Sequence, residues 1–491
     1  MKIKKNLRNI FCILGFLTII YIIYNLIFHN VSYTINPLQL ILSIIIYILF
    51  IFILWKIYQK FLLNKKYGIP IVFLIFVLLQ LIFACVFVVK PTWDFGTVYN
   101  IVLDDIINGN SIFNAIYMNQ VKLNLGIGIL LKIVFYPFYY LGINHYVIVG
   151  ILLNIIFIDL GLIYLYKLIT LVTNKKISTI CLFMILTFTP FICYVPIFYT
   201  DTLSLPFGII GLYYVFKYFY TNDNKKRYLV ISGISLGIGG CIKTPVLIVY
   251  IAILIWLIFR EKKDPAKSTI KKTVLLTICM LIPFVTFNIY VSSHLEESML
   301  KKYQIPKTHW IMMGLTGNGG FNESEADFTT SFPTEEAKKN ANIRVIKERL
   351  KKYWNNHTII QFYTNKLTYT WGDGTFFAAE KLQREPKYTT IASKYVYGEE
   401  KWYYYGFAQA EWLVALILIV IGIVLRPYLT YKQRDLQLLS LISTAGILIL
   451  LLIWETRSRY LVNLLPVILI STYIGIIGIR NYYQIKKEKS K

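Results

Sequence analysis

The chain has 491 residues, of which 57% are hydrophobic, 16% aromatic and only 15% charged. Apolar runs of about 18 or more residues recur along it, and that length is enough for a helix to cross a bilayer. This composition excludes a soluble globular protein and predicts an all-α polytopic membrane protein. The formal net charge of +26 does not indicate a nucleic-acid partner, because most lysines and arginines flank apolar runs, as the positive-inside rule describes.

No metal or cofactor site is predicted. The six cysteines all lie in or at the ends of apolar segments and form no CxxC pair, so neither a disulfide framework nor a zinc site is indicated. Four of the histidines are scattered along the chain at no metal-ligand spacing: His145, His294, His309 and His357.

The apolar runs predict about twelve spanning helices. The first, residues 9–28, follows a basic stretch, is too long for a signal peptide and has no small-residue cleavage site after it, so it predicts a span that starts in the cytoplasm. The second and third predicted spans are residues 38–55 and 70–89. The later predicted spans are 147–171, 177–197, 202–220, 228–242, 245–259, 273–292, 411–428, 436–454 and 460–478.

Residues 123–141 are apolar enough to span but contain Lys132 and Pro137. If this segment crossed the membrane, every later basic loop would face outward, against the positive-inside rule. We therefore interpret residues 106–141 as amphipathic or re-entrant helices at the outer surface. With this arrangement both termini are cytoplasmic, and the protein is expected in a bacterial cell membrane.

A polar region at residues 293–410 separates two membrane parts, 1–292 and 411–491, and predicts one inserted extracytoplasmic domain. Its clearest element is a helix from Glu335 to about Trp354, because Thr334 can cap it and acidic residues fill its first turn. A cluster of glycines around Asn318 predicts a turn before that helix.

The strongest candidate for function is Asp94, in the stretch 90–96 directly after the third span. A carboxylate at the edge of the hydrocarbon layer is costly, and such groups usually face a cavity and bind or react. A helix cap is the plain alternative, but the flanking Trp93 and Phe95 favour a packed site. We interpret Asp94 as a catalytic base in an outer loop covering residues 90–146.

Three further carboxylates are weaker candidates for the acceptor or donor site. Asp104 and Asp105 follow Asp94 in the same loop, and each either binds a ligand or is simply solvated. Asp201 opens a later span from the outside, where a helix N-terminus stabilises a carboxylate without any function.

Three cations fall on the outer side, where the positive-inside rule does not explain them. Lys243 follows a glycine-rich turn, a plausible phosphate cradle. Arg457 and Arg459 lie between two closely spaced spans, and the arginine fork suits phosphate oxygens. The alternative for the arginines is a salt bridge to Glu455, which would leave one of them free.

These motifs, in this order along the chain, resemble the GT-C fold glycosyltransferases. They are the Trp93-Asp94 loop, Asp201, the turn Lys243-Thr244-Pro245 and the segment 457–460. The most similar families are the protein O-mannosyltransferases, the lipid A aminoarabinose transferase and bacterial relatives in cell-envelope glycosylation. The segment 309–315 also resembles a signature of multi-pass proteins from low-GC Gram-positive bacteria.

The resemblance implies an inverting glycosyltransferase that takes a sugar from a polyprenyl-phosphate-linked donor without a metal or other cofactor. Asp94 would be the general base, and Lys243, Arg457 and Arg459 would bind the lipid phosphate. The expected partners are membrane lipids and a cell-envelope glycan, teichoic acid or protein as acceptor.

Two alternatives remain in other classes. A transporter or flippase of a lipid-linked saccharide would use the same cations for phosphate and Asp94 for proton coupling, although carboxylates concentrated at the outer surface favour surface chemistry over a midplane pathway. A non-catalytic membrane subunit would tolerate replacement of Asp94.

Overall fold

The computed structural model of the protein describes residues 2–29, 32–33, 35–221, 223, 225–261 and 265–490. Within these ranges the chain is helical and forms no strand, which confirms the all-α prediction. The helices of the first membrane part are α1 (Lys2–Phe28), α2 (Pro37–Phe61), α3 (Gly68–Val86), α4 (Trp93–Asn108), α5 (Ile116–Gln120), α6 (Leu125–Tyr140), α7 (Tyr146–Thr170), α8 (Lys175–Leu186), α9 (Pro190–Cys193), α10 (Thr200–Leu203), α11 (Leu205–Tyr220), α12 (Arg227–Ile242), α13 (Leu247–Phe259) and α14 (Ala266–His294). The polar region contains α15 (Glu297–Tyr303), α16 (Thr308–Met313), α17 (Glu323–Thr330), α18 (Glu335–Asn355), α19 (Ile359–Trp371), α20 (Ala378–Leu382) and α21 (Ile391–Val396). The last part contains α22 (Trp402–Val424), α23 (Tyr431–Ile453) and α24 (Leu465–Lys489), and short 3₁₀ turns are η1 (Lys122–Asn124), η2 (Thr244–Val246), η3 (Arg426–Tyr428) and η4 (Ser458–Leu464).

Nine helices among the described residues are long and apolar enough to cross a membrane, by length and composition. The protein is therefore a multi-pass membrane protein, whereas the count of twelve spans stays a prediction. The nine segments are Asn6–Phe28, Pro37–Phe61, Gly68–Val86, Lys122–Tyr140, Tyr146–Thr170, Ala266–His294, Trp402–Val424, Tyr431–Ile453 and Ser458–Lys489.

The predicted spans between residues 177 and 259 are broken or short in the structure. The chain breaks between α8 and α9 and again between α10 and α11, and α12 and α13 are separated by Lys243 and the turn η2. A helix of 16 residues such as α11 or α12 rises only about 24 Å, less than the roughly 30 Å hydrocarbon core. Broken helices at membrane depth are tolerated where protein surrounds them, and most residues of α8 to α11 are buried.

The segment Lys122–Tyr140 is among the nine candidate spans, although the charge distribution predicts that it lies at the outer surface. Its helix α6 packs against α4 and α7. Lys132 on α6 forms an ion pair with Asp105 on α4, with 2.8 Å between Nζ and Oδ1. The charge that argued against a spanning segment is therefore neutralised within the protein.

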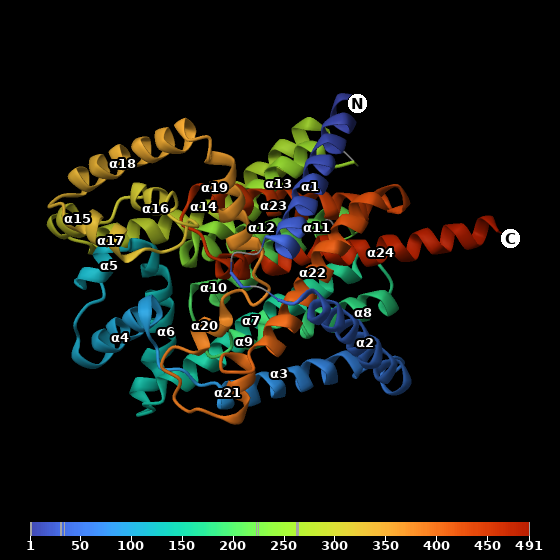
Figure 1. Cartoon of the computed structure of the whole chain (residues 1–491), viewed down its shortest axis with the longest axis horizontal. Helices are drawn as coiled ribbons and strands as arrows, with labels where there is room; N and C mark the ends of the chain where they lie inside the picture. Colours follow the sequence, from blue (N-terminus) through green and yellow to red (C-terminus); the bar gives the residue numbers. More distant parts are fainter. Residues whose placement is uncertain are drawn as a thin grey trace.

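The predicted helix of the polar region is confirmed as α18, Glu335–Asn355. The Thr334 side chain accepts a hydrogen bond from the backbone nitrogen of Ala337, and Glu335 and Glu336 occupy the first turn. Figure 1 shows α15 to α18 at one end of the molecule, next to α5, and the C-terminal end of α24 at the opposite end.

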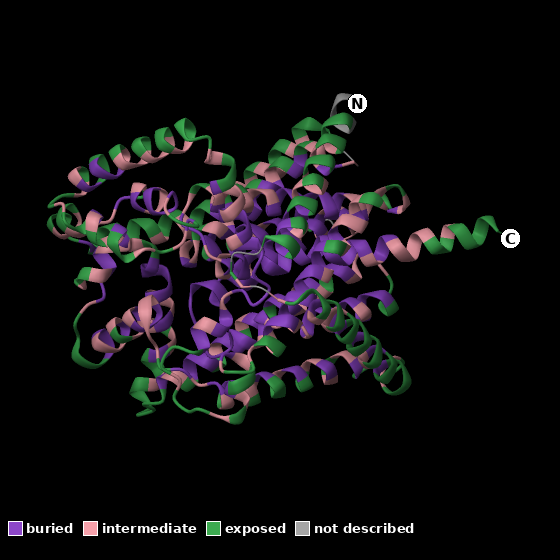
Figure 2. Cartoon of the chain, in the orientation of Figure 1, coloured by how far each residue is buried: buried purple, intermediate pink, exposed green. Residues whose placement is uncertain are grey.

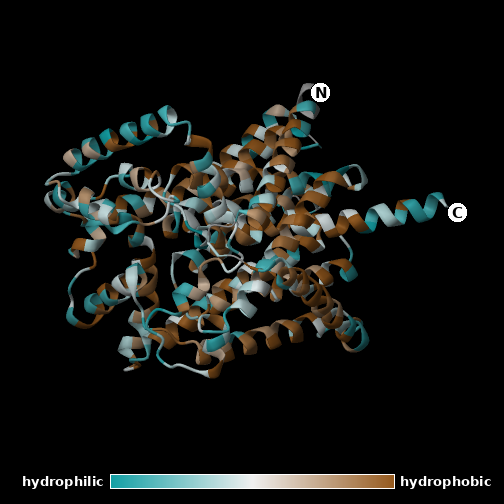
Figure 3. Ribbon diagram, viewed as in Figure 1, coloured by the Kyte–Doolittle hydropathy of each residue, from teal (hydrophilic) through white to brown (hydrophobic). Residues whose placement is uncertain are grey.

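Burial and hydropathy also distinguish the two ends of the molecule from its centre. Buried residues concentrate in the central helices, whereas the outer face of α18 and the end of α24 are exposed (Figure 2). Figure 3 shows that these two segments are hydrophilic and that apolar helices lie between them. This pattern fits a membrane domain with polar regions at both ends.

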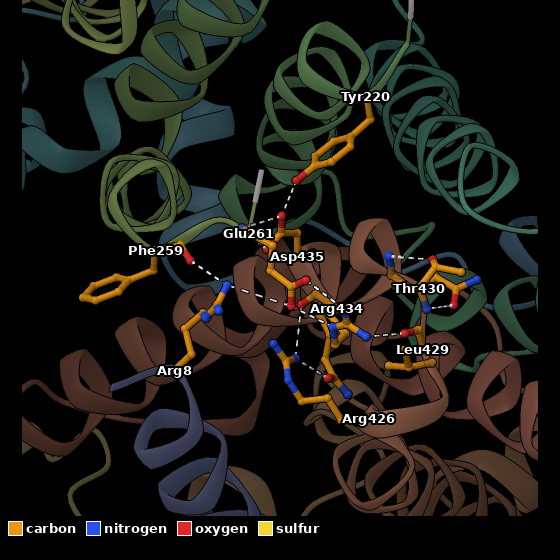
Figure 4. Close-up of polar contacts among 11 residues, drawn as sticks. Arg8, Tyr220, Phe259, Glu261, Arg426, Leu429, Thr430, Arg434 and Asp435 are labelled. Carbon is orange, nitrogen blue, oxygen red and sulfur yellow. Dashed lines mark hydrogen bonds and ion pairs between the residues drawn. The ribbon is translucent and has the colours of Figure 1, made fainter. Parts of the chain in front are cut away.

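A polar network ties several helices together close to Arg8 on α1 (Figure 4). Arg434 on α23 donates from Nε and Nη2 to the two carboxylate oxygens of Glu261, both at 2.7 Å. The backbone nitrogen of Glu261 donates to Asp435, which also accepts from the Tyr220 hydroxyl. Half-buried charges are stable only when they are paired and hydrogen-bonded, so we assign this network a structural role.

The side of each loop can be tested by thiol accessibility. We expect cysteines introduced at Lys226 and Lys267 to be shielded from an impermeant thiol reagent in intact cells, and one at Glu323 to react, because the positive-inside rule places the first two in the cytoplasm. The native Cys85, which is exposed, is replaced by serine beforehand to remove background labelling. Labelling at 226 or 267 in intact cells would show that the assigned sides are wrong and that Asp94 lies at the cytoplasmic face.

Candidate functional site

The loop that carries Asp94 is held by a distant part of the chain. The backbone nitrogen of Lys90 donates to the carbonyl oxygen of Glu385 at 3.0 Å, and that of Lys387 donates to Val88 at 2.8 Å. An isolated antiparallel bridge joins Val89 to Pro386 between them. The segment after α20 therefore fixes the start of α4.

The backbone at the start of α4 is strained. Trp93 has φ of 47°, a conformation that costs a bulky residue roughly 1–3 kcal/mol and persists only where the surrounding structure imposes it. A Cβ at Gly96 would lie 2.4 Å from the carbonyl oxygen of Pro91, so this tight turn also requires glycine. The half-buried Asp94 side chain is held in the first turn of α4.

Aromatic contacts dock α4 on the segment before α10. The ring centroids of Phe95 and Phe198 lie 4.7 Å apart, and those of Trp93 and Tyr199 lie 4.9 Å apart, both edge-to-face. Such pairs add about 0.5–1.5 kcal/mol each beyond burial. The residues that flank Asp94 thus anchor it against the segment that leads to Asp201.

A chain of hydrogen bonds runs from Tyr199 to Tyr117, which lies close to Asp94. The Tyr199 hydroxyl donates to Asn124 Oδ1 at 3.0 Å, and Asn124 Nδ2 donates to the Tyr117 hydroxyl at 2.7 Å. Burial and the negative charge of the nearby Asp94 raise the pKa of the Tyr117 phenol. Tyr117 therefore stays neutral beside the Asp94 carboxylate.

Two basic side chains contact the indole ring of Trp93, the neighbour of Asp94. Lys381 Nζ lies 3.3 Å from the ring centroid and the guanidinium carbon of Arg459 lies 4.7 Å from it. Lys381 is only 4% exposed. Burial, together with the positive charges of Arg459 and Arg384, lowers the pKa of Lys381 to about 5, even though Asp201 and Asp94 act in the opposite direction.

Arg457 extends this group of cations. Its guanidinium carbon lies 4.2 Å from the ring centroid of Phe377 and 5.3 Å from that of Tyr369. Ser458 donates to a carboxylate oxygen of the buried Asp373 at 2.6 Å, which fixes the turn between the two arginines. We call Lys381, Arg384, Arg457 and Arg459 the cation cluster.

The cation cluster forms no ion pair of its own within the described residues, although the negative charges of Asp94, Asp201 and Glu455 act on Arg459 from nearby. Arg459 Nη1 is buried without a hydrogen-bond partner in the part of the chain that the structure describes. Burial and the charges of Arg459 and Arg457 lower the pKa of Arg384. A buried, unpaired guanidinium nitrogen is costly, so this arrangement suits an anionic ligand.

Lys243 lies beside the cluster but is already paired. Its ammonium group forms an ion pair with Asp201, and Nζ lies 5.4 Å from the ring centroid of Tyr460. The sequence suggested separate roles for Asp201 and Lys243, whereas the structure joins them across α10 and η2. Because Asp201 already neutralises Lys243, this lysine attracts a phosphate less strongly than Arg459 does.

Asp104 and Asp105 lie away from the other candidates. Ten residues of helix separate Asp104 from Asp94, a rise of about 15 Å. Asp104 accepts hydrogen bonds from Asn108 and Asn110, which lower its pKa. Asp105 is buried and binds Lys132 and the backbone nitrogen of Ile112, so its contacts connect α4 to α6.

Sequence reasoning missed the members of the site that come from the polar region and from short turns. Lys381 and Arg384 lie in a stretch with no motif, and nothing in the sequence links it to residues 88–93. Tyr117 and Asn124 lie within a segment that the sequence predicted at the surface, and no role was predicted for either of them. Among the described residues no group of three or more His, Cys, Asp or Glu side chains could hold a metal ion.

The helical fold and its apolar segments define an integral membrane protein that crosses the membrane several times. A family model described as conserved hypothetical integral membrane protein matches residues 1–476, and the chain belongs to this family. No curated protein and no solved structure matches the chain.

Proposed function

We propose that the protein transfers a sugar from a polyprenyl-phosphate-linked donor to an envelope acceptor at the outer face of the membrane. The observation that carries this proposal is the contact of Lys381 and Arg459 with Trp93, next to Asp94. It brings a candidate base and an unpaired cationic site together at the edge of the membrane domain. Sugar transfer from a lipid phosphate needs both.

In this reaction Asp94 accepts the proton of the acceptor hydroxyl as that oxygen attacks the anomeric carbon of the donor sugar. The bond from the anomeric carbon to the phosphate oxygen breaks on the opposite side, so the configuration inverts. The phosphate leaves with the bonding electron pair. The ring contacts of Trp93 and Phe95 support the step because they hold the first turn of α4, and Asp94 with it, in place.

The cation cluster would stabilise the departing phosphate. Arg459 offers a buried guanidinium nitrogen without a partner in the described part of the chain, and Arg457 lies two residues away. Fixed donors aimed at developing negative charge are often the largest single contribution to catalysis. An arginine fork also matches two phosphate oxygens at once.

The protonation state of Lys381 depends on whether an anion is bound beside it. With a pKa of about 5, its amine is largely neutral near pH 7 when no anion is bound. A bound phosphate adds negative charge beside it and favours the protonated form. Proton uptake would therefore accompany donor binding, and the lysine would carry its charge when the phosphate needs it.

The test compares cells with and without the gene and then uses the purified protein. We expect mass spectrometry to show one saccharide modification missing from the envelope of the deletion strain, with accumulation of a polyprenyl-phosphate sugar. The purified protein in detergent should then transfer the sugar from that lipid to the envelope acceptor. A transporter would not do so, because it moves its substrate without forming a glycosidic bond. Absence of transfer with an active, folded preparation would contradict the proposal.

A further inference from the structure

A polar cavity lies beside Arg457. It has a volume of about 170 Å³ and is lined by Tyr369 and by residues 316–318 and 320–322. Drug-sized ligands usually occupy roughly 300–1,000 Å³. This cavity therefore suits a single small ring.

The loop that forms one wall is rigidly attached to the site. Gly319 has φ of 82°, a conformation that glycine adopts without strain. Its carbonyl oxygen accepts a hydrogen bond from the backbone nitrogen of Thr456 at 2.7 Å. Lys366 Nζ donates to the carbonyl oxygen of Gly314 at 2.5 Å. The loop is thus anchored to the turn that carries Arg457 and Arg459.

The lining has a particular chemistry, because it is neutral, hydrogen-bonding and aromatic. Asn318 is exposed, and its amide makes no hydrogen bond within the part of the chain that the structure describes. The side-chain oxygen of Asn322 caps α17 by accepting a hydrogen bond from the backbone nitrogen of Ser324, so we assign Asn322 a structural role. Phe321 is 59% exposed, so its ring surface is accessible to a ligand in the cavity.

Tyr369 connects this cavity to the cation cluster. Its ring lines the cavity and also lies 5.3 Å from the guanidinium carbon of Arg457. A ligand in the cavity would therefore lie next to the group that we assign to the lipid phosphate. No charged side chain lines the cavity, so a second phosphate is not its expected occupant.

We propose that this cavity, formed by residues 316–322 and Tyr369, is a subsite for one neutral sugar ring of a saccharide acceptor. Asn318 offers an amide that can both donate and accept, which matches sugar hydroxyls. Phe321 and Tyr369 offer apolar ring surfaces for the C–H faces of the sugar. The choice of acceptor over donor rests on the proposed function, because the donor sugar must lie between Asp94 and the phosphate site.

The first test measures binding and needs no activity. The purified full-length protein in detergent is titrated with neutral trisaccharides of glucose, mannose, galactose or N-acetylglucosamine, and binding is followed by saturation-transfer NMR. We expect at least one to bind. Asn318→Ala or Phe321→Ala should weaken that binding about 3- to 10-fold, the loss expected for one hydrogen bond or one aromatic contact.

Matched controls come from the same region. Asn340→Ala and Trp354→Ala remove an exposed amide and an exposed aromatic side chain on α18, and binding should be unchanged in both. Thermal unfolding of every variant confirms that it is folded. Absence of binding by all four sugars, or equal loss in the controls, would overturn the subsite.

The second test separates acceptor from donor. In the transfer assay, Asn318→Ala and Phe321→Ala should raise KM for the acceptor 3- to 10-fold and leave KM for the lipid donor unchanged. A rise confined to the donor would overturn the assignment to the acceptor. If saccharides bind and the variants weaken that binding, but the wild-type protein transfers no sugar, the subsite stands and the proposed glycosyl transfer is wrong.

Discussion

Asp94→Asn is expected to abolish sugar transfer while leaving expression and donor binding nearly intact. Asparagine keeps the size and hydrogen-bonding shape of the side chain, but it cannot take a proton from the acceptor hydroxyl. General base catalysis contributes about 10²- to 10⁴-fold, so the rate constant kcat should fall by that factor. Product formation by the purified variant, measured at saturating donor, checks this expectation.

Asp104→Asn is the matched control, because it makes the same change at another half-buried position of the same helix, about 15 Å from Asp94. Its activity should remain close to that of the wild-type protein. Asp105→Asn should instead weaken thermal stability, since Asp105 binds Lys132 between α4 and α6. If Asp94→Asn forms product at the wild-type rate, Asp94 is not the base, and if all three variants do, the mechanism proposed for this site is wrong.

Arg459→Gln is expected to reduce kcat/KM for the lipid donor by about 10²-fold or more. The change removes a fixed positive charge beside Trp93 and Tyr460, and the loss of one donor to developing negative charge typically has an effect of this size. The kcat/KM of Arg459→Lys should lie between those of the wild-type protein and Arg459→Gln, because lysine keeps the positive charge but lacks the two-pronged geometry of the guanidinium group. Transfer kinetics at varied donor concentration give both values.

Arg344→Gln on α18 makes the same chemical change at a surface position, where Arg344 lies 4.0 Å from Glu348. Its effect should be small, because exposed ion pairs contribute little. Comparable losses at Arg344 and Arg459 would show that the protein needs only its general positive charge. The specific phosphate site would then be refuted.

The sequence predicted the class of the protein and several of its elements for local reasons. The apolar runs determine a helical membrane protein, because a backbone in lipid must satisfy its own hydrogen bonds. The helix α18 was also predictable, since Thr334 and the acidic residues after it act within one turn. Such signals operate between residues close in sequence and need no knowledge of packing.

The candidate site was predictable only in part. Asp94 was indicated by its place at the end of an apolar run, and Arg457 and Arg459 were indicated by their place outside the positive-inside pattern. Grouping Asp104 and Asp105 with them rested on sequence proximity, which helix geometry overrides, because a rise of about 15 Å separates them. Lys243 and Asp201 were each visible, but their pairing was not.

Only the tertiary structure decided which distant segments meet. The backbone pairing of residues 88–90 with 385–387 brings Lys381 onto Trp93, and the link from Thr456 to Gly319 sets the neutral cavity beside Arg457. Neither contact leaves a periodic pattern in the sequence, because each depends on how whole helices pack. The sequence by itself determined a helical membrane protein with polar ends, and packing between remote segments determined where its charges gather.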